Sequence, residues 1–302
     1  MQYDLEYEQP ANEDVFDPNQ GHGSHLECID DDIDQILQSA LDLLAKSKNI
    51  RMIASPEVMA KRDGKEYDTR LILLSKNEDQ DITARIILEA ADNGAELVSM
   101  FPYVVNNQSI PMALKKIDEY ANGFEAVLTC EYDDIELRFF DVDYPIHKKE
   151  YVIGNTYSFA LSALAYQAEL VPESEMLFEI EPETVEKMCE VDPSVGERDE
   201  NGNVLPMKVS MDIFAACLQN DERYPDDAEF WSPIQSKVRK ATLFNYDLYR
   251  MEITIHQDES EEHIVNIPLV ARASFFEDKP GKGISIRGHL WLQGRRCLSE
   301  NE

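Results

Sequence analysis

The stretch GKGISIRGHLWLQGRR, residues 281–296, decides how the rest of the chain is interpreted. Apolar residues stand three and five places after its first glycine, and an apolar, aromatic run follows. A similar stretch, GNTYSFALSALAYQ, occupies residues 154–167. Apolar residues at every second position are typical of a strand that buries one face. We therefore interpret each stretch as the last long strand of a small antiparallel β unit.

The same alternation recurs before both stretches. Residues 135–139 alternate apolar and charged side chains, and residues 249–255 alternate apolar side chains with charged or polar ones. We expect a β-rich α+β fold with two small antiparallel, OB-like barrel modules, an N-terminal helix and an α+β attachment. The predicted domains are an acidic flexible tail (1–28), an N-terminal α+β region (29–171) that contains the first module (124–170), an acidic connecting segment (172–228) and a second module (229–298).

Three passages carry a resemblance to known proteins: EYDDIELRFFDVDY at 131–144, GNTYSFALSALAY at 154–166 and PGKGISIRGHLWLQG at 280–294. Together they resemble uncharacterised bacterial proteins with OB-like small β-barrel modules. The resemblance covers about two fifths of the chain and concerns structural motifs. It implies a fold and no activity.

Other segments give local predictions. Apolar residues at helical spacing, with acids first and lysines last, predict a helix over 29–48. Asp63-Gly64 and Asn93-Gly94 indicate two hairpins. Residues 82–91 fit both helical and strand periods, and their β-branched content favours a strand. Proline in a first turn predicts a short helix over Pro111–Tyr120.

Charge is distributed unevenly along the chain, whose net charge is −32. Residues 1–34 carry 11 acids and no Lys or Arg, residues 167–229 carry 18 acids against 4 bases, and residues 230–297 carry 8 acids against 10 bases. Charge runs usually form solvated surface, which keeps a protein soluble. The alternative is a partner with a basic surface, or an acidic segment that shields the C-terminal unit from anions.

Composition also indicates in which cellular compartment we expect the protein. Five scattered cysteines without a C-x-x-C pair argue against a disulfide framework and favour the cytoplasm. We expect no secretory signal, because the N-terminus lacks a basic leader and an apolar segment. No apolar run approaches the roughly 20 residues that a membrane-spanning helix needs.

Catalytic and metal-binding motifs are missing from the sequence, so we predict neither an enzyme nor a cofactor. His22 and His25 have the spacing of metal ligands, but the flanking glycines favour a loose linker. Asp141 and Asp143 resemble an acid pair, yet without a neighbouring His, Cys or third acid we interpret them as part of a surface loop. Dispersed acids would leave an enzyme possible, with no particular residues to assign.

One constellation fits a binding site. Cations and aromatic residues gather in the second module, and single-strand-binding barrels combine cations for phosphates with aromatic faces for bases. The competing interpretation places Trp291 and Tyr249 in the core. The candidate nucleic-acid-binding residues are Lys237, Arg239, Lys240, Tyr249, Arg250, Arg287 and Trp291.

Two functional hypotheses follow. The first is a non-catalytic interaction protein whose acidic segments engage a basic protein partner. The second is single-stranded nucleic-acid binding by the C-terminal module, which the net charge of −32 opposes.

Overall fold

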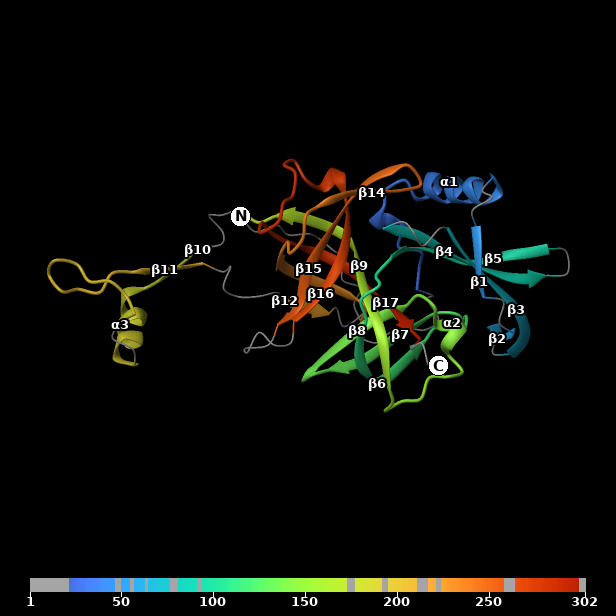
Figure 1. Ribbon diagram of the computed structural model, residues 1–302, viewed down its shortest axis with the longest axis horizontal. Coiled ribbons are helices and arrows are strands. Elements are labelled where there is room, and N and C mark those ends of the chain that lie inside the picture. Colours follow the sequence, from blue (N-terminus) through green and yellow to red (C-terminus); the bar gives the residue numbers. More distant parts are fainter. Residues whose placement is uncertain are drawn as a thin grey trace, which may run out of the picture.

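The fold of the chain is β-rich, with few helices (Figure 1). The computed structural model describes residues 22–46, 50–54, 57–62, 65–76, 81–91, 94–172, 177–191, 195–210, 217–220, 224–257 and 264–298. Within these ranges no helix is long and apolar enough to cross a membrane.

A large mixed sheet forms the centre of the molecule. Its strands run in the order β12 (Cys217–Asn220), β13 (Asp227–Pro233), β17 (Ser285–Cys297), β8 (Ile135–Asp141), β7 (Ala126–Tyr132), β6 (Ile110–Glu119), β9 (Thr156–Leu170), β16 (Ile264–Arg272), β15 (Tyr246–Gln257) and β14 (Arg239–Leu243).

β9 and β17 are the two stretches from which the sequence was interpreted, and both are strands. They pair antiparallel with each other from Ser158–Cys297 to Leu170–Ile286. The pairings therefore return from β17 through β8, β7, β6 and β9 to β17. A second path runs from β9 through β16 and β15, and an isolated bridge between Ile253 and Ile234 leads back to β13 and β17. The two predicted modules thus share these strands in one sheet and are not independent.

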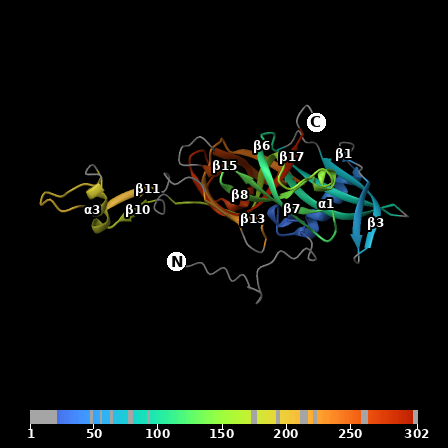
Figure 2. The ribbon, with the colours of Figure 1, turned by 90° about the horizontal axis from the view of Figure 1, so that it is seen from below.

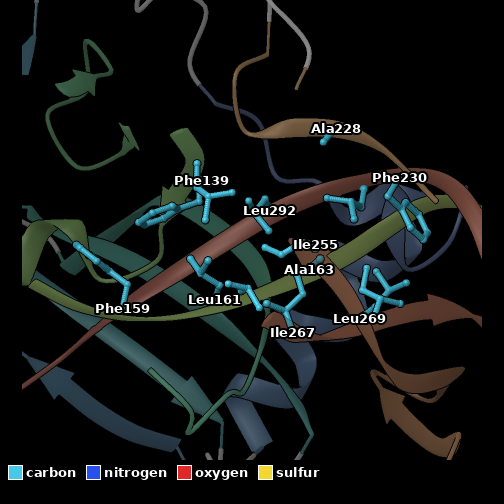
Figure 3. Packing of buried hydrophobic residues seen from close by; sticks show 14 of the residues in the cluster. Phe139, Phe159, Leu161, Ala163, Ala228, Phe230, Ile255, Ile267, Leu269 and Leu292 are labelled. Atoms are coloured by element: carbon cyan, nitrogen blue, oxygen red, sulfur yellow. The ribbon is translucent and has the colours of Figure 1, made fainter. Parts of the chain in front are cut away.

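Both faces of these strands are buried, which explains their nearly continuous apolar sequence. On β9, Leu161 and Ala163 point into a core inside the curved sheet, whereas Leu164 faces a second core. On β17, Leu292 enters the first core and Trp291 the second. Figure 3 shows the first core, where β9 and β17 cross above residues of β15 and β16.

The second core lies between the large sheet and a smaller one. The smaller sheet runs β1, β3, β4, β5, with β2 paired to β3. Helix α1 (Ile33–Lys46) buries Ile36 and Ala40 in this core and lies on the small-sheet side of the molecule (Figure 1). The strands are β1 (Ile50–Ala54), β2 (Glu57–Arg62), β3 (Lys65–Lys76), β4 (Ile82–Ala91) and β5 (Gly94–Val104).

A third unit stands apart from both sheets in two views (Figures 1 and 2). It contains the hairpin-like pair β10 (Leu177–Ile180) and β11 (Met207–Ser210), with helix α3 (Pro182–Val191) between them. We call residues 177–210 the acidic unit. The remaining short elements are the 3₁₀ helices at Leu26–Cys28 and Ala273–Phe275 and helix α2 (Tyr144–His147).

Most local predictions are confirmed. α1 is a helix, residues 82–91 form a strand, and β2–β3 and β4–β5 are antiparallel pairs around the predicted turns. The turns themselves, residues 63–64 and 92–93, lie outside the described residues, as do residues 1–21 of the predicted tail.

The predicted helix over Pro111–Tyr120 is wrong, because these residues form β6. Met112 and Leu114 are buried in strand alternation. A bulge between Leu114 and Lys116 then adds one residue, so that Ile117 packs against the same core. The bulge produces a spacing of three between apolar residues, which imitates a helix.

Candidate functional site

The predicted nucleic-acid-binding residues are only partly brought together. Arg239 and Lys240 on β14 pair with Arg250 and Tyr249 on β15, and Lys237 precedes them. Lys237, Arg239 and Lys240 are exposed, whereas Tyr249 is half-buried against Phe276. Arg287 and Trp291 lie on β17, which pairs with β9, and β16 lies between β9 and β15. No single face therefore presents the whole set.

Acids neutralise several of these cations. Asp81 pairs with both Arg239, at 3.1 Å, and Arg250, at 3.3 Å. Arg250 Nη1 also donates to the carbonyl oxygens of Asp81 and Val105, at 3.0 and 2.9 Å. Burial lowers the pKa of the Arg250 guanidinium, and Asp81 opposes that shift. Arg250 thus joins β15 to the open end of the β4–β5 pair, where β4 begins and β5 ends.

The β17 candidates have structural partners as well. Arg287 Nε donates to Glu169 at 2.7 Å. Trp291 is completely buried, and the ring of His25 stacks on it with centroids 4.2 Å apart. Its indole offers no exposed face to a base, so the interpretation of Trp291 as a core residue is the correct one.

Residues 22–32, which we call the N-terminal strap, are held by a buried polar chain. His22 Nε2 lies 2.6 Å from Asp226 Oδ2, and His25 Nε2 lies 3.1 Å from His22 Nδ1. His25 Nδ1 bonds Tyr166 Oη, which lies 2.8 Å from Asp227 Oδ1. The loose linker predicted at His22–His25 is therefore wrong: desolvated aromatic packing and hydrogen bonds hold both rings.

Aromatic stacking places the two rings. His22 stacks on Phe140 with centroids 4.0 Å apart, while His25 covers Trp291, whose Nε1–H donates to Asp226 at 2.8 Å. Burial, and next His22, lowers the pKa of His25 to about 3. The pKa of Asp226 is also lowered: its burial favours the neutral acid, but His22 outweighs that effect. Leu26, Cys28 and Ile29 extend the strap into the second core.

The Asp141–Asp143 pair is buried, which corrects the predicted surface loop. Arg85, fully buried on β4, pairs with Asp143 at 3.1 Å and lies over the Tyr103 ring. Tyr151 donates to Asp141 at 2.6 Å. Burial raises the pKa of Asp141 to about 7, against the bond from Tyr151. A carboxyl group with this pKa gains or loses a proton near neutrality.

Neither buried cluster forms a metal centre. Among the residues that the structure describes, no group of three or more His, Cys, Asp or Glu side chains is arranged to hold a metal ion. Both clusters connect elements far apart in sequence, and hydrogen bonds and ion pairs join their members.

The acidic unit differs from these clusters because several of its described acids are exposed to solvent. It carries nine Asp and Glu against three Lys and Arg, a net charge of −6. Glu181, Glu183 and Glu186 are exposed on and just before α3, and Met188 on the same helix is 40% exposed. Val185 is buried beneath Gly196. The unit therefore offers acids and an apolar side chain on one small scaffold.

Comparison of the chain with protein-family models, with curated proteins and with solved structures found no match to it.

Proposed function

We propose that the protein is a non-catalytic interaction protein whose acidic unit binds a basic protein partner. The observation that carries the proposal is the exposure of Glu181, Glu183 and Glu186 on a unit that stands apart from both sheets (Figures 1 and 2). Complementary charge steers a partner to such a surface and fixes its orientation.

Apolar contacts supplement the charge. Met188 is 40% exposed and Leu205 38% exposed within the same unit. Aliphatic side chains beside carboxylates suit the long methylene stems of lysine and arginine, which pack on apolar surface while their charged ends bind acids. The preferred partner is therefore a Lys- and Arg-rich segment that also carries apolar residues.

The large sheet serves as the scaffold in this proposal. We infer that its two circuits of pairing correspond to the OB-like barrel modules expected from the sequence, each completed by a strand of the other. Both circuits include β9 and β17. β17 completes the circuit of the first module, and β9 completes that of the second. The five scattered cysteines without a C-x-x-C pair are consistent with a reducing compartment such as the cytoplasm.

Single-stranded nucleic acid is the alternative ligand. Three exposed cations, Lys237, Arg239 and Lys240, support it. The acids beside Arg239, Arg250 and Arg287 and the burial of Trp291 weigh against it. We therefore favour the basic protein partner.

The test is a titration of the full chain with a fluorescent Lys- and Arg-rich peptide that contains leucines. Binding by wild type should weaken at least about tenfold in the triple variant Glu181→Gln, Glu183→Gln, Glu186→Gln, and should fall steeply with salt. The matched control neutralises three exposed acids elsewhere, Asp247→Asn, Glu277→Gln and Asp278→Asn. Equal affinities for the two triple variants would reject the acidic unit as the site, and tighter binding of an oligonucleotide would favour the alternative.

A further inference from the structure

The polar side chains Asp226, His22, His25, Tyr166 and Asp227 form a chain of hydrogen bonds. The number of protons that this polar chain needs can be counted from its geometry. Its five groups are joined by four links, and each hydrogen bond needs one proton between its two heavy atoms. With both aspartates ionised and both histidines neutral, the chain owns three such protons, one on each imidazole and one on the Tyr166 hydroxyl. One proton more is required to make all four links.

Local contacts indicate where that proton lies. His25 Nε2 is 2.9 Å from the carbonyl oxygen of His22, which can only accept, so Nε2 carries a hydrogen. Burial keeps His25 neutral, so its Nδ1 is an acceptor and takes the Tyr166 hydroxyl proton. The oxygen of Tyr166 then has no proton to give to Asp227.

The other end of the chain is consistent with this order. His22 Nε2–H and Trp291 Nε1–H both point to Asp226 Oδ2, which suits an ionised carboxylate at that end. Asp226 is therefore the acceptor terminus, and the additional proton belongs at the opposite terminus.

We propose that Asp227, a half-buried residue at the end of this polar chain, is a proton site: its carboxylic acid donates to Tyr166 and completes the hydrogen bonds that hold the N-terminal strap. The strap and its surroundings contribute other ionisable groups. Glu27 and Cys28 lie on the strap, Asp118, Tyr120 and Glu125 flank the end of β6, and Arg272 on β16 bonds Asp31 and the Glu27 carbonyl. The negative charges among them favour uptake of a proton by Asp227, and Arg272 opposes it.

Docking of the strap is consequently linked to pH in both directions. Above about pH 6.5 the released histidines are neutral and Asp227 is ionised, so docking takes up one proton. Docking then weakens by up to about tenfold for each pH unit of increase. Below about pH 6.5 the released strap holds two protons on its histidines against one in the docked chain, so docking weakens again. The optimum lies near pH 6.5.

Amide exchange measures this docking in the full-length protein. The amides of Cys28 and Ile29 donate to the carbonyl oxygens of His25 and Leu26, so their protection reports the docked strap. Hydrogen–deuterium exchange of the peptide that covers residues 22–32, corrected for intrinsic rates, should give a maximum of protection near pH 6.5. Between pH 7 and 8.5 the protection factor should fall by up to about tenfold per unit.

Two substitutions test whether the additional proton lies between Asp227 and Tyr166. Asp227→Asn supplies a permanent N–H donor to Tyr166 and should flatten the decline above pH 7. Tyr166→Phe removes two links and leaves two protons for two links, so it should flatten the decline independently. Glu169→Gln, an exposed carboxylate-to-amide change on the same strand as Tyr166, should retain the wild-type profile. Loss of the decline in either chain variant supports the site. A flat wild-type profile, or a decline that persists in both variants, overturns it.

Discussion

The guanidinium of Arg85 and the carboxylate of Asp143 meet at 3.1 Å, and neither side chain has more than 7% of its surface exposed. The pair joins β4 of the small sheet to the segment between β8 and α2 of the large one. Arg85→Met would leave Asp143 buried without its charge partner, so we expect a loss of about 3–5 kcal/mol in the free energy of unfolding.

Urea unfolding measures this loss, and an exposed ion pair gives the control. Arg138 pairs with Glu136 at 2.9 Å, with 38% and 51% of the two side chains exposed. Arg138→Met should cost less than about 1 kcal/mol. Similar costs for the two substitutions would show that Arg85 does not join the sheets.

Asp141 gives the chain a second pH dependence. Its pKa is about 7 in the fold and near 4 when unfolded, so the folded state holds a proton that the unfolded state has lost. Its contribution to stability is complete below about pH 4 and is lost as the pH rises to about 7. Asp141→Asn removes this dependence.

The stability difference between Asp141→Asn and wild type should therefore shift in favour of the variant by about 1.4 kcal/mol per pH unit between pH 4.5 and 6.5, and level off above 7. Denaturant unfolding at a series of pH values tests this. Asp134→Asn, in an exposed turn, is the matched control and should show no such trend. A pH-independent difference for Asp141→Asn would contradict its raised pKa.

Gly288 on β17 and Gly281, which lies before that strand, differ in what an added methyl group would meet. At Gly288 a Cβ would lie 2.0 Å from the carbonyl oxygen of Gln167, on the paired strand beside a bulge. At Gly281 the nearest atom is a side-chain carbon of Ile284, at 3.5 Å. Gly288→Ala should cost about 3 kcal/mol, and Gly281→Ala less than about 0.5 kcal/mol. Equal midpoints in urea for the two variants would argue against the close approach of β9 and β17.

Arg250 was predicted from the sequence to bind phosphates, and its contacts give it a structural task. Arg250→Ala should lower stability by about 2 kcal/mol, because the carbonyl oxygens of Asp81 and Val105 lose the hydrogen bonds from its guanidinium. Lys240→Ala, at an exposed position on the paired strand, should change stability by less than about 0.5 kcal/mol. Urea unfolding distinguishes a structural role of Arg250 from a phosphate-binding one. Wild-type stability of the Arg250→Ala protein would contradict the structural role and favour Arg250 as a phosphate ligand.

The local spacing of apolar residues was sufficient to predict most strands. It was insufficient to predict which strands pair with each other. The apolar runs of β9 and β17 show two buried faces, but their pairing joins residues more than 100 positions apart, which no local pattern encodes. β6 was missed for a related reason, because the bulge beside Lys115 changes the period within one strand.

Buried polar residues escaped prediction because their partners are distant. His22 and Asp226 are 204 positions apart, and Arg85 and Asp143 are 58 apart. Histidines and aspartates in a charged sequence are normally exposed, so composition favoured a linker and a loop. One local signal was available for the strap: apolar Leu26, Cys28 and Ile29 follow His25 at once, which is unusual for a flexible tail.

The most direct test of the proposed function is to determine where on the protein the basic partner binds. The measurement is an NMR titration of the ¹⁵N-labelled full chain with the Lys- and Arg-rich peptide. We predict that amide shifts are confined to the acidic unit, above all to α3 and the residues around Leu205. Shifts centred on β14 and β15, or no saturable shift in the acidic unit, would contradict the proposal.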